Sequence, residues 1–196
     1  MTFTYRELQL EKAGVMSYEM KKFAMPYIVD KPTGLWALDL EEFKSISPHC
    51  VDYFKRIGQL DNLYKACVII VHPKTTGKDA HVDNNIEPPV DSGTTKGCIS
   101  LNFEIENCLK TQVIFYKYIS GDKKILPLHD PTQGSYIYYS GCEMEELGRY
   151  NLRWPVVMNN TVPHAILNDT DSVRISFSFR FKVDPWEFAK DPWWRP

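Results

Sequence analysis

The stretch that decides the fold is MNNTVPHAILNDTDSVRISFSFRF, residues 158–181. From position 173 onward it alternates with a period of two, which predicts a β-strand over 173–182. One face of this strand is apolar and must be buried, whereas the other face is a polar row: Arg174, Ser176, Ser178 and Arg180. On an isolated strand the polar row is expected to face solvent. In a barrel that is apolar outside, under covering helices, and polar inside, the same row would line a cavity.

Six further runs of β-branched and aromatic residues, separated by Gly, Pro, Asn and Asp, also predict strands. They span 65–71, 98–105, 111–119, 135–139, 154–158 and 162–167. About seven strands in roughly 120 residues are typical of a sandwich or a barrel. Alternation within two of these runs directs Asn102 away from Leu101 and Phe103, and Tyr116 away from Phe115.

The first third of the chain, 1–63, has charged and irregular segments with helical stretches. The clearest helix is predicted over 48–57, where Ser47 can cap the first turn and Pro48 suits its first position. At the other end, 184–196 carries three of the five tryptophans and is expected to dock against the body. Because no repeat or linker marks a boundary, we expect a single domain over 1–196, with helical support in 1–63, a β core in 64–183 and this Trp-rich tail.

The composition excludes several classes of protein. The chain has 196 residues, of which 43% are hydrophobic and 24% charged, so it can bury one sizeable core. A net charge of -2 gives no overall attraction to nucleic acid or to an anionic membrane. No apolar run approaches the roughly 20 residues of a membrane span, and the N-terminus lacks a signal-peptide profile. These features predict a cytoplasmic protein without a membrane partner.

The five cysteines do not suggest disulfide bonds or a zinc site. Their number is odd and no C-x-x-C pair occurs, which argues against a disulfide framework and a zinc ribbon. Cys67, Cys98 and Cys108 lie in or beside apolar runs and are expected to pack as small hydrophobic side chains.

The segment AHVDNN, 80–85, is a candidate for metal binding. His81 and Asp83 are two residues apart, so on an extended backbone both side chains point the same way and can hold one ion. His-x-Asp alone is a weak signal, and a third ligand is needed. His164 on a later predicted strand supplies it, because two histidines and one carboxylate form the facial triad of non-haem Fe(II) oxygenases.

A candidate anion site follows on the last predicted strand. Arg174 comes ten residues after His164, and Ser176 shares its strand face. A guanidinium beside a hydroxyl suits the distal carboxylate of a dicarboxylic keto acid. Arg180 is on the same face and is an alternative anchor, but the neighbouring hydroxyl favours Arg174.

The three motifs HVD, PHAI and RIS, in this order and spacing, resemble the 2-oxoglutarate- and Fe(II)-dependent oxygenases. The stretches GCISLNFEIEN and TQVIFYKY, together with 158–181, are most similar to small prolyl-hydroxylase-like or aspartyl-hydroxylase-like members, many of them from phage and bacteria. The resemblance implies a mainly β fold with helical support: a double-stranded β-helix, or cupin-like jelly roll, with metal and cosubstrate between its sheets.

The resemblance also implies the chemistry and the residues that perform it. Fe(II) and O2 would convert 2-oxoglutarate to succinate and CO2 while a prime substrate is hydroxylated. The metal ligands would be His81, Asp83 and His164. The cosubstrate would contact the family's Arg and Ser positions and a polar side chain on the facing strands: Arg174, Ser176, Asn102 and Tyr116.

Several alternatives remain open on the sequence alone. His49, His72 and His129 lack a ligand partner at the right spacing and are expected to be surface or hydrogen-bonded histidines. The whole constellation could be coincidental in a non-catalytic jelly-roll structural or binding protein. A cupin-type isomerase or dioxygenase with another metal would leave Arg174 and Ser176 without a role.

The sequence pI near 6.2 favours a peptide or a small molecule over nucleic acid. Residues 84–97 are long enough for a flap over the metal, and with the N-terminal third they are expected to select the substrate.

Overall fold

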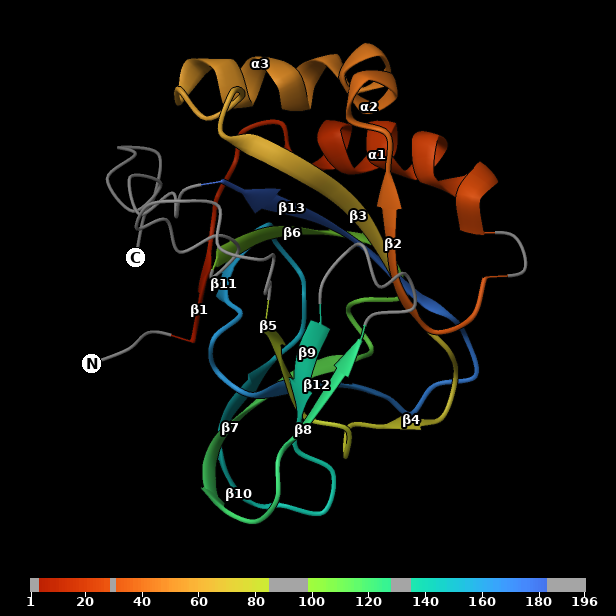
Figure 1. The fold of residues 1–196 in the computed structure, drawn as a ribbon. Coiled ribbons are helices and arrows are strands. Elements are labelled where there is room, and N and C mark those ends of the chain that lie inside the picture. The colour runs from red at the N-terminus through yellow and green to blue at the C-terminus, as the bar shows by residue number, and fades with distance from the viewer. Residues whose placement is uncertain (1–3, 29–30, 85–98, 128–134, 183–196) are drawn as a thin grey trace.

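Two antiparallel β-sheets form the body of the protein in a computed structural model that describes residues 4–28, 31–84, 99–127 and 135–182 (Figure 1). The first sheet has the order β1 (Tyr5–Glu7), β11 (Val156–Asn159), β6 (Ile99–Glu106), β13 (Arg174–Phe181), β3 (Leu63–Val71) and β2 (Gly34–Leu38). The second has the order β10 (Glu143–Tyr150), β7 (Gln112–Ser120), β12 (His164–Asn168), β5 (His81–Asn84), β9 (Ser135–Tyr138) and β8 (Lys124–Pro127), and β4 (Thr75–Thr76) pairs with β12.

The chain winds between the two sheets. From β5 it crosses to β6 in the first sheet and back to β7 in the second, and β10, β11, β12 and β13 repeat this exchange. Such winding, with strands distant in sequence becoming neighbours, is the double-stranded β-helix, and it confirms the predicted jelly roll.

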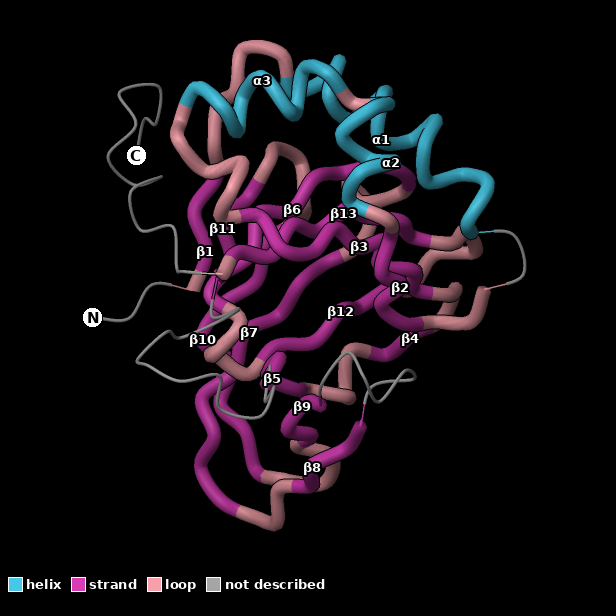
Figure 2. The backbone as a smooth tube through the Cα atoms, turned by 45° about the horizontal axis from the view of Figure 1, so that its top comes forward, coloured by secondary structure: helices cyan, strands magenta, loops and turns pink. Residues whose placement is uncertain are grey.

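Three helices cover the outer face of the first sheet, as Figure 2 shows in cyan. They are α1 (Ala13–Ile28), α2 (Leu40–Ile46) and α3 (Pro48–Arg56). The Asp39 side chain caps α2 by accepting a hydrogen bond from the Glu42 amide at 2.7 Å. As predicted, α3 begins at Pro48, but the Ser47 side chain makes no capping hydrogen bond to it and donates to Glu19 Oε2 at 3.0 Å instead. The N-terminal third is nevertheless more than helical support, because β1 and β2 from this region extend both edges of the first sheet.

The seven predicted strands all form, with ends shifted by a few residues. Six further described strands were not among the predicted runs: β1, β2, β4, β5, β8 and β10. In β10 most side chains are exposed, and among the described strands it pairs only with β7. Its sequence therefore carries no apolar alternation, and main-chain pairing rather than burial defines it.

Because side chains alternate along β13, one face of the strand lines the hydrophobic core and the other lines the space between the two sheets. The apolar side chains of β13 pack under the helices in the main hydrophobic core. The polar row faces the second sheet, and all four of its residues are at most 3% exposed: Arg174, Ser176, Ser178 and Arg180. The barrel-like alternative is therefore the correct one, since helices cover the apolar face and the polar row turns inward.

Phe179 on β13 provides a test of this core. Its side chain is fully buried, and its ring lies 4.9 Å from that of Phe54 and 5.0 Å from those of Phe43 and Phe177. We expect Phe179→Ala to lower the free energy of unfolding by about 3–5 kcal/mol because it leaves a cavity. Urea unfolding measures this, with Tyr18→Ala, at a 63% exposed position, as a control that changes stability by about 0.5 kcal/mol or less. A loss below about 1 kcal/mol at Phe179 would contradict this core assignment.

The remaining fold-level predictions have mixed outcomes. Cys67 and Cys108 are buried free thiols, as expected. Cys98, His129, nearly all of the predicted flap and the Trp-rich tail lie outside the described residues. Within the described ranges, none of the helices combines the length and apolar character that a membrane crossing requires.

Candidate metal centre

The three predicted metal ligands meet between the two sheets. His81 and Asp83 share one face of β5, and His164 on β12 lies directly opposite His81 in the strand register. One ligand atom from each residue lies within 4.8 Å of the others, and the two imidazole centroids are 4.7 Å apart. The tertiary structure therefore brings together two nitrogen donors and one oxygen donor that are up to 83 residues apart in the sequence.

Backbone carbonyls orient both imidazoles. His164 Nδ1 lies 2.9 Å from the Val162 carbonyl oxygen, and His81 Nδ1 lies 3.2 Å from that of Asp79. Because a carbonyl only accepts, Nδ1 carries the proton in each ring, and Nε2 is the atom that can bind a metal. His81 Nε2 is 3.7 Å from Asp83 Oδ1, on the side where the three residues converge.

A buried arginine holds the carboxylate. Arg180 Nη2 lies 2.7 Å from Asp83 Oδ2, and the Arg180 side chain is only 4% exposed. Burial raises the pKa of Asp83, but the charge of Arg180 and the two imidazoles outweigh it and lower the pKa to about 2. Asp83 is therefore ionised near neutral pH, as a metal ligand must be.

His164 is also in its ligand form. Burial disfavours the imidazolium, and the neighbouring His81 acts in the same direction, so the pKa of His164 is lowered to about 4. The ring is thus neutral at physiological pH, and its Nε2 lone pair is available without loss of a proton.

Arg174 and Ser176 form a second polar group on the inner face of β13. Arg174 Nη1 donates to Ser176 Oγ at 2.9 Å, and both side chains are almost fully buried. In the part of the chain that the structure describes, Arg174 Nε has no hydrogen-bond partner and the guanidinium makes no ion pair. Glu104, opposite Ser176 in the β6–β13 register, offsets part of this charge without forming an ion pair. The guanidinium keeps an unbonded N–H, so this group fits an anionic ligand that enters the cavity.

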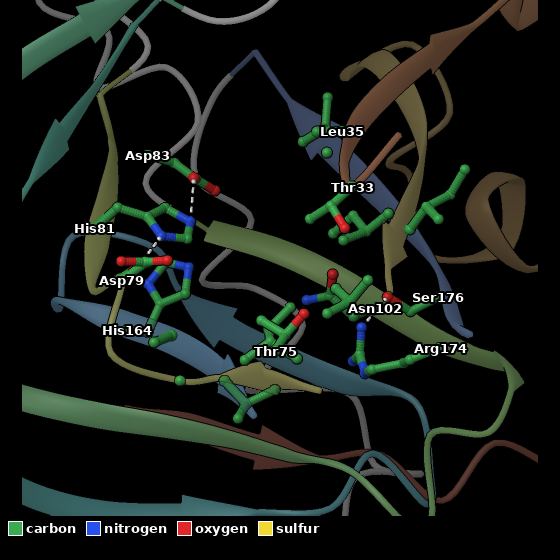
Figure 3. A pocket seen from close by; sticks show the side chains of 18 of the residues that line it. Thr33, Leu35, Thr75, Asp79, His81, Asp83, Asn102, His164, Arg174 and Ser176 are labelled. Atoms are coloured by element: carbon green, nitrogen blue, oxygen red, sulfur yellow. Dashed lines mark hydrogen bonds and ion pairs between the residues drawn. The ribbon is translucent and has the colours of Figure 1, made fainter. Parts of the chain in front are cut away.

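One cavity of about 320 Å³ contains both groups. Figure 3 shows His81, Asp83 and His164 on one side and Arg174 and Ser176 on the other, with Asn102 between them. The volume is typical of a small-molecule site and is sufficient for a short dicarboxylate. The donor set at one end and the buried guanidinium at the other therefore fit a metal and an anionic cosubstrate together.

Tyr116 does not belong to this cavity. The register pairs Phe115, not Tyr116, with His164, so alternation along β7 places Tyr116 on the outer face of the second sheet. Its hydroxyl donates to the Gly77 carbonyl at 3.1 Å, and the cavity lining contains Val113 instead. The predicted inward orientation of Tyr116 was wrong, because strand alternation alone does not say which face is inside.

The other described histidines have structural partners. His49 Nδ1 lies 2.6 Å from Glu19 Oε1, and His72 Nε2 lies 3.1 Å from the Lys31 carbonyl. Neither lines the cavity. Sequence reasoning did not identify Arg180 as the partner of Asp83, nor Asp79 and Val162 as imidazole acceptors. Every residue has a backbone carbonyl, so the residue type does not reveal which carbonyl accepts a hydrogen bond. The one available signal was that Asp79 and Val162 each lie two residues before a histidine.

Comparisons with known proteins return similarity in structure only. No protein-family model and no curated protein matches the chain. Two solved structures of HygX from Streptomyces hygroscopicus are similar over 94% of this chain and 84% of theirs. The structure with nickel and 2-oxoglutarate bound has a TM-score of 0.43 at 11% identity, and the one with iron bound has 0.42 at 10%. The chemistry of the site therefore rests on its own residues.

Proposed function

We propose that this protein is a 2-oxoglutarate- and Fe(II)-dependent dioxygenase that hydroxylates a peptidyl side chain or a small molecule. The observation that carries the proposal is the pairing, in one cavity, of a two-histidine, one-carboxylate donor set with a buried guanidinium that forms no ion pair with the described residues and whose Nε has no hydrogen-bond partner among them. Neither group alone would distinguish an oxygenase from another metal-binding jelly roll.

His81, Asp83 and His164 would hold the Fe(II), and three protein ligands leave coordination positions open for a cosubstrate and O2. When bound, the metal supplies the oxidation, in which 2-oxoglutarate and O2 become succinate and CO2 while one oxygen atom enters a C–H bond of the substrate. The protein keeps its ligands ready for this role by holding Asp83 ionised and His164 neutral.

The remaining cavity residues would bind and enclose the cosubstrate. Arg174 and Ser176 offer a guanidinium and a hydroxyl to the 5-carboxylate, and Asn102 offers an amide between this anchor and the metal ligands. Tyr150 and Met158 close the cavity with largely buried apolar surface, which limits water around the reacting groups.

Binding of metal and cosubstrate to the intact protein tests the proposal directly. We expect Mn²⁺ with 2-oxoglutarate, each at about 100 times its dissociation constant, to stabilise the fold by about 3 kcal/mol per ligand. For a chain of this length that is a rise in melting temperature of roughly 5–10 °C for each ligand. Succinate, which lacks the keto oxygen needed for chelation, is the matched control and should give a smaller rise.

A second measurement follows the reaction. Anaerobically purified protein given Fe(II), 2-oxoglutarate and O2 should form succinate, and mass spectrometry should find peptides or metabolites that gain one oxygen atom. Protein that neither binds iron nor responds to 2-oxoglutarate would instead be a non-catalytic jelly-roll binding protein.

A further inference from the structure

The turn between β11 and β12 contacts two of the three proposed metal ligands through its backbone. The carbonyl of Asn160 accepts a hydrogen bond from the Asp83 amide at 3.3 Å. The carbonyl of Val162 accepts the one from His164 Nδ1 at 2.9 Å. A displacement of this turn would therefore change the position of Asp83 on β5 and the orientation of the His164 ring together.

The turn is braced internally. Asn159 Oδ1 accepts hydrogen bonds from the Thr161 amide at 3.0 Å and from its hydroxyl at 2.7 Å. The Val162 amide donates to the Asn159 carbonyl at 3.3 Å. These short-range bonds make the turn rigid. A displacement of Asn160 is therefore expected to move Val162 as well.

A buried side-chain link ties the turn to the first sheet. Ser100 on β6 is fully buried, and its hydroxyl donates to Asn160 Oδ1 at 3.0 Å. Ser100 Oγ in turn accepts a hydrogen bond from Asn102 Nδ2 at 2.9 Å. Since Ser100 has a single hydroxyl proton, donation to Asn160 requires acceptance from Asn102, which fixes the direction of the whole chain of bonds.

We infer that Ser100 and Asn160 are positioning residues of the proposed metal centre, which hold the Asp83 backbone and the His164 ring and link them to Asn102 in the cosubstrate cavity. The inference rests on the proposed function. Neither residue lines the cavity, so each acts through the groups that it bonds. The link also connects the two sheets, because β6 belongs to the first and β5 and β12 to the second.

Ser100→Ala breaks this link with the loss of one oxygen atom. Partners outside the first coordination shell typically contribute about 10- to 100-fold to metal affinity, and we expect a weakening of Co²⁺ binding within this range. Isothermal titration of the intact protein with Co²⁺ alone, without cosubstrate, measures the dissociation constant. The visible absorption of the bound Co²⁺ should also change, because the ligand geometry becomes less fixed.

Ser178→Ala is the matched control. Ser178 lies on β13, the strand next to β6, and is fully buried like Ser100, but its hydroxyl has no hydrogen-bond partner among the described residues. Ser178→Ala therefore also removes a buried hydroxyl oxygen but breaks no hydrogen bond. Its Co²⁺ affinity should stay within about twofold of the wild type. Ser100→Thr keeps the hydroxyl and should retain most of the affinity.

The outcomes separate this inference from the proposed function. Wild-type protein that binds no Co²⁺ overturns the metal centre and the inference with it. Wild-type binding with equal affinities in Ser100→Ala and Ser178→Ala overturns only the link. If Ser100→Ala does not fold, Asn160→Ala removes the acceptor from the other side, and wild-type affinity in that variant overturns the link as well.

Discussion

Replacing His164 with alanine is expected to abolish 2-oxoglutarate-dependent succinate formation and to weaken Fe(II) binding by more than about 100-fold. The substitution leaves His81 and Asp83, two proposed ligands from a single strand, and removes the proposed ligand on β12. Succinate release and metal titration of the purified variant measure the two effects.

The control for His164 is a histidine of the same chain outside the cavity. His72 is exposed, and its ring contacts only the Lys31 carbonyl among the bonds that the structure shows for it. His72→Ala should therefore retain metal binding and succinate formation within about twofold. Normal turnover in a folded His164→Ala protein would reject the metal centre.

Arg174→Ala is expected to raise the KM for 2-oxoglutarate by at least about 30-fold. Truncating one partner of a buried, hydrogen-bonded charge pair costs about 2–5 kcal/mol, and 1.4 kcal/mol is a factor of ten. The cosubstrate's distal carboxylate would enter a buried site with Ser176 as its remaining donor on β13. Titration of succinate formation against 2-oxoglutarate measures this KM.

Two measurements distinguish a cosubstrate anchor from a general structural arginine. Metal affinity without 2-oxoglutarate should change little in Arg174→Ala, because the guanidinium is not bonded to any of the three metal ligands. Arg149→Ala removes an exposed guanidinium that pairs with Glu146, and its KM should match the wild type. An unchanged KM in Arg174→Ala would show that the carboxylate binds elsewhere.

Strand alternation was a reliable guide to which residues share a face, but not to which face is inside. In β13 the apolar face is continuous and packs under the helices. The polar row therefore has to face the cavity. In β7 both faces carry large apolar or aromatic side chains, and the choice of Tyr116 over Phe115 was wrong. The pairing of Phe115 with His164 across 49 residues decides that orientation, and no local pattern reports such a register.

The sequence by itself predicted a sandwich or barrel, because period-two alternation is a property of the chain, and the resemblance carried by HVD, PHAI and RIS implied the jelly roll. The order and spacing of these motifs also singled out the proposed ligands His81, Asp83 and His164 and the proposed anion anchor Arg174. Only the tertiary structure decided how these residues are held. It pairs Asp83 with Arg180, and it brings the β11–β12 turn into hydrogen-bond contact with two proposed ligands, Asp83 and His164. The physical reason is that such contacts depend on long-range register and on backbone carbonyls, which every residue possesses and which residue type therefore cannot reveal.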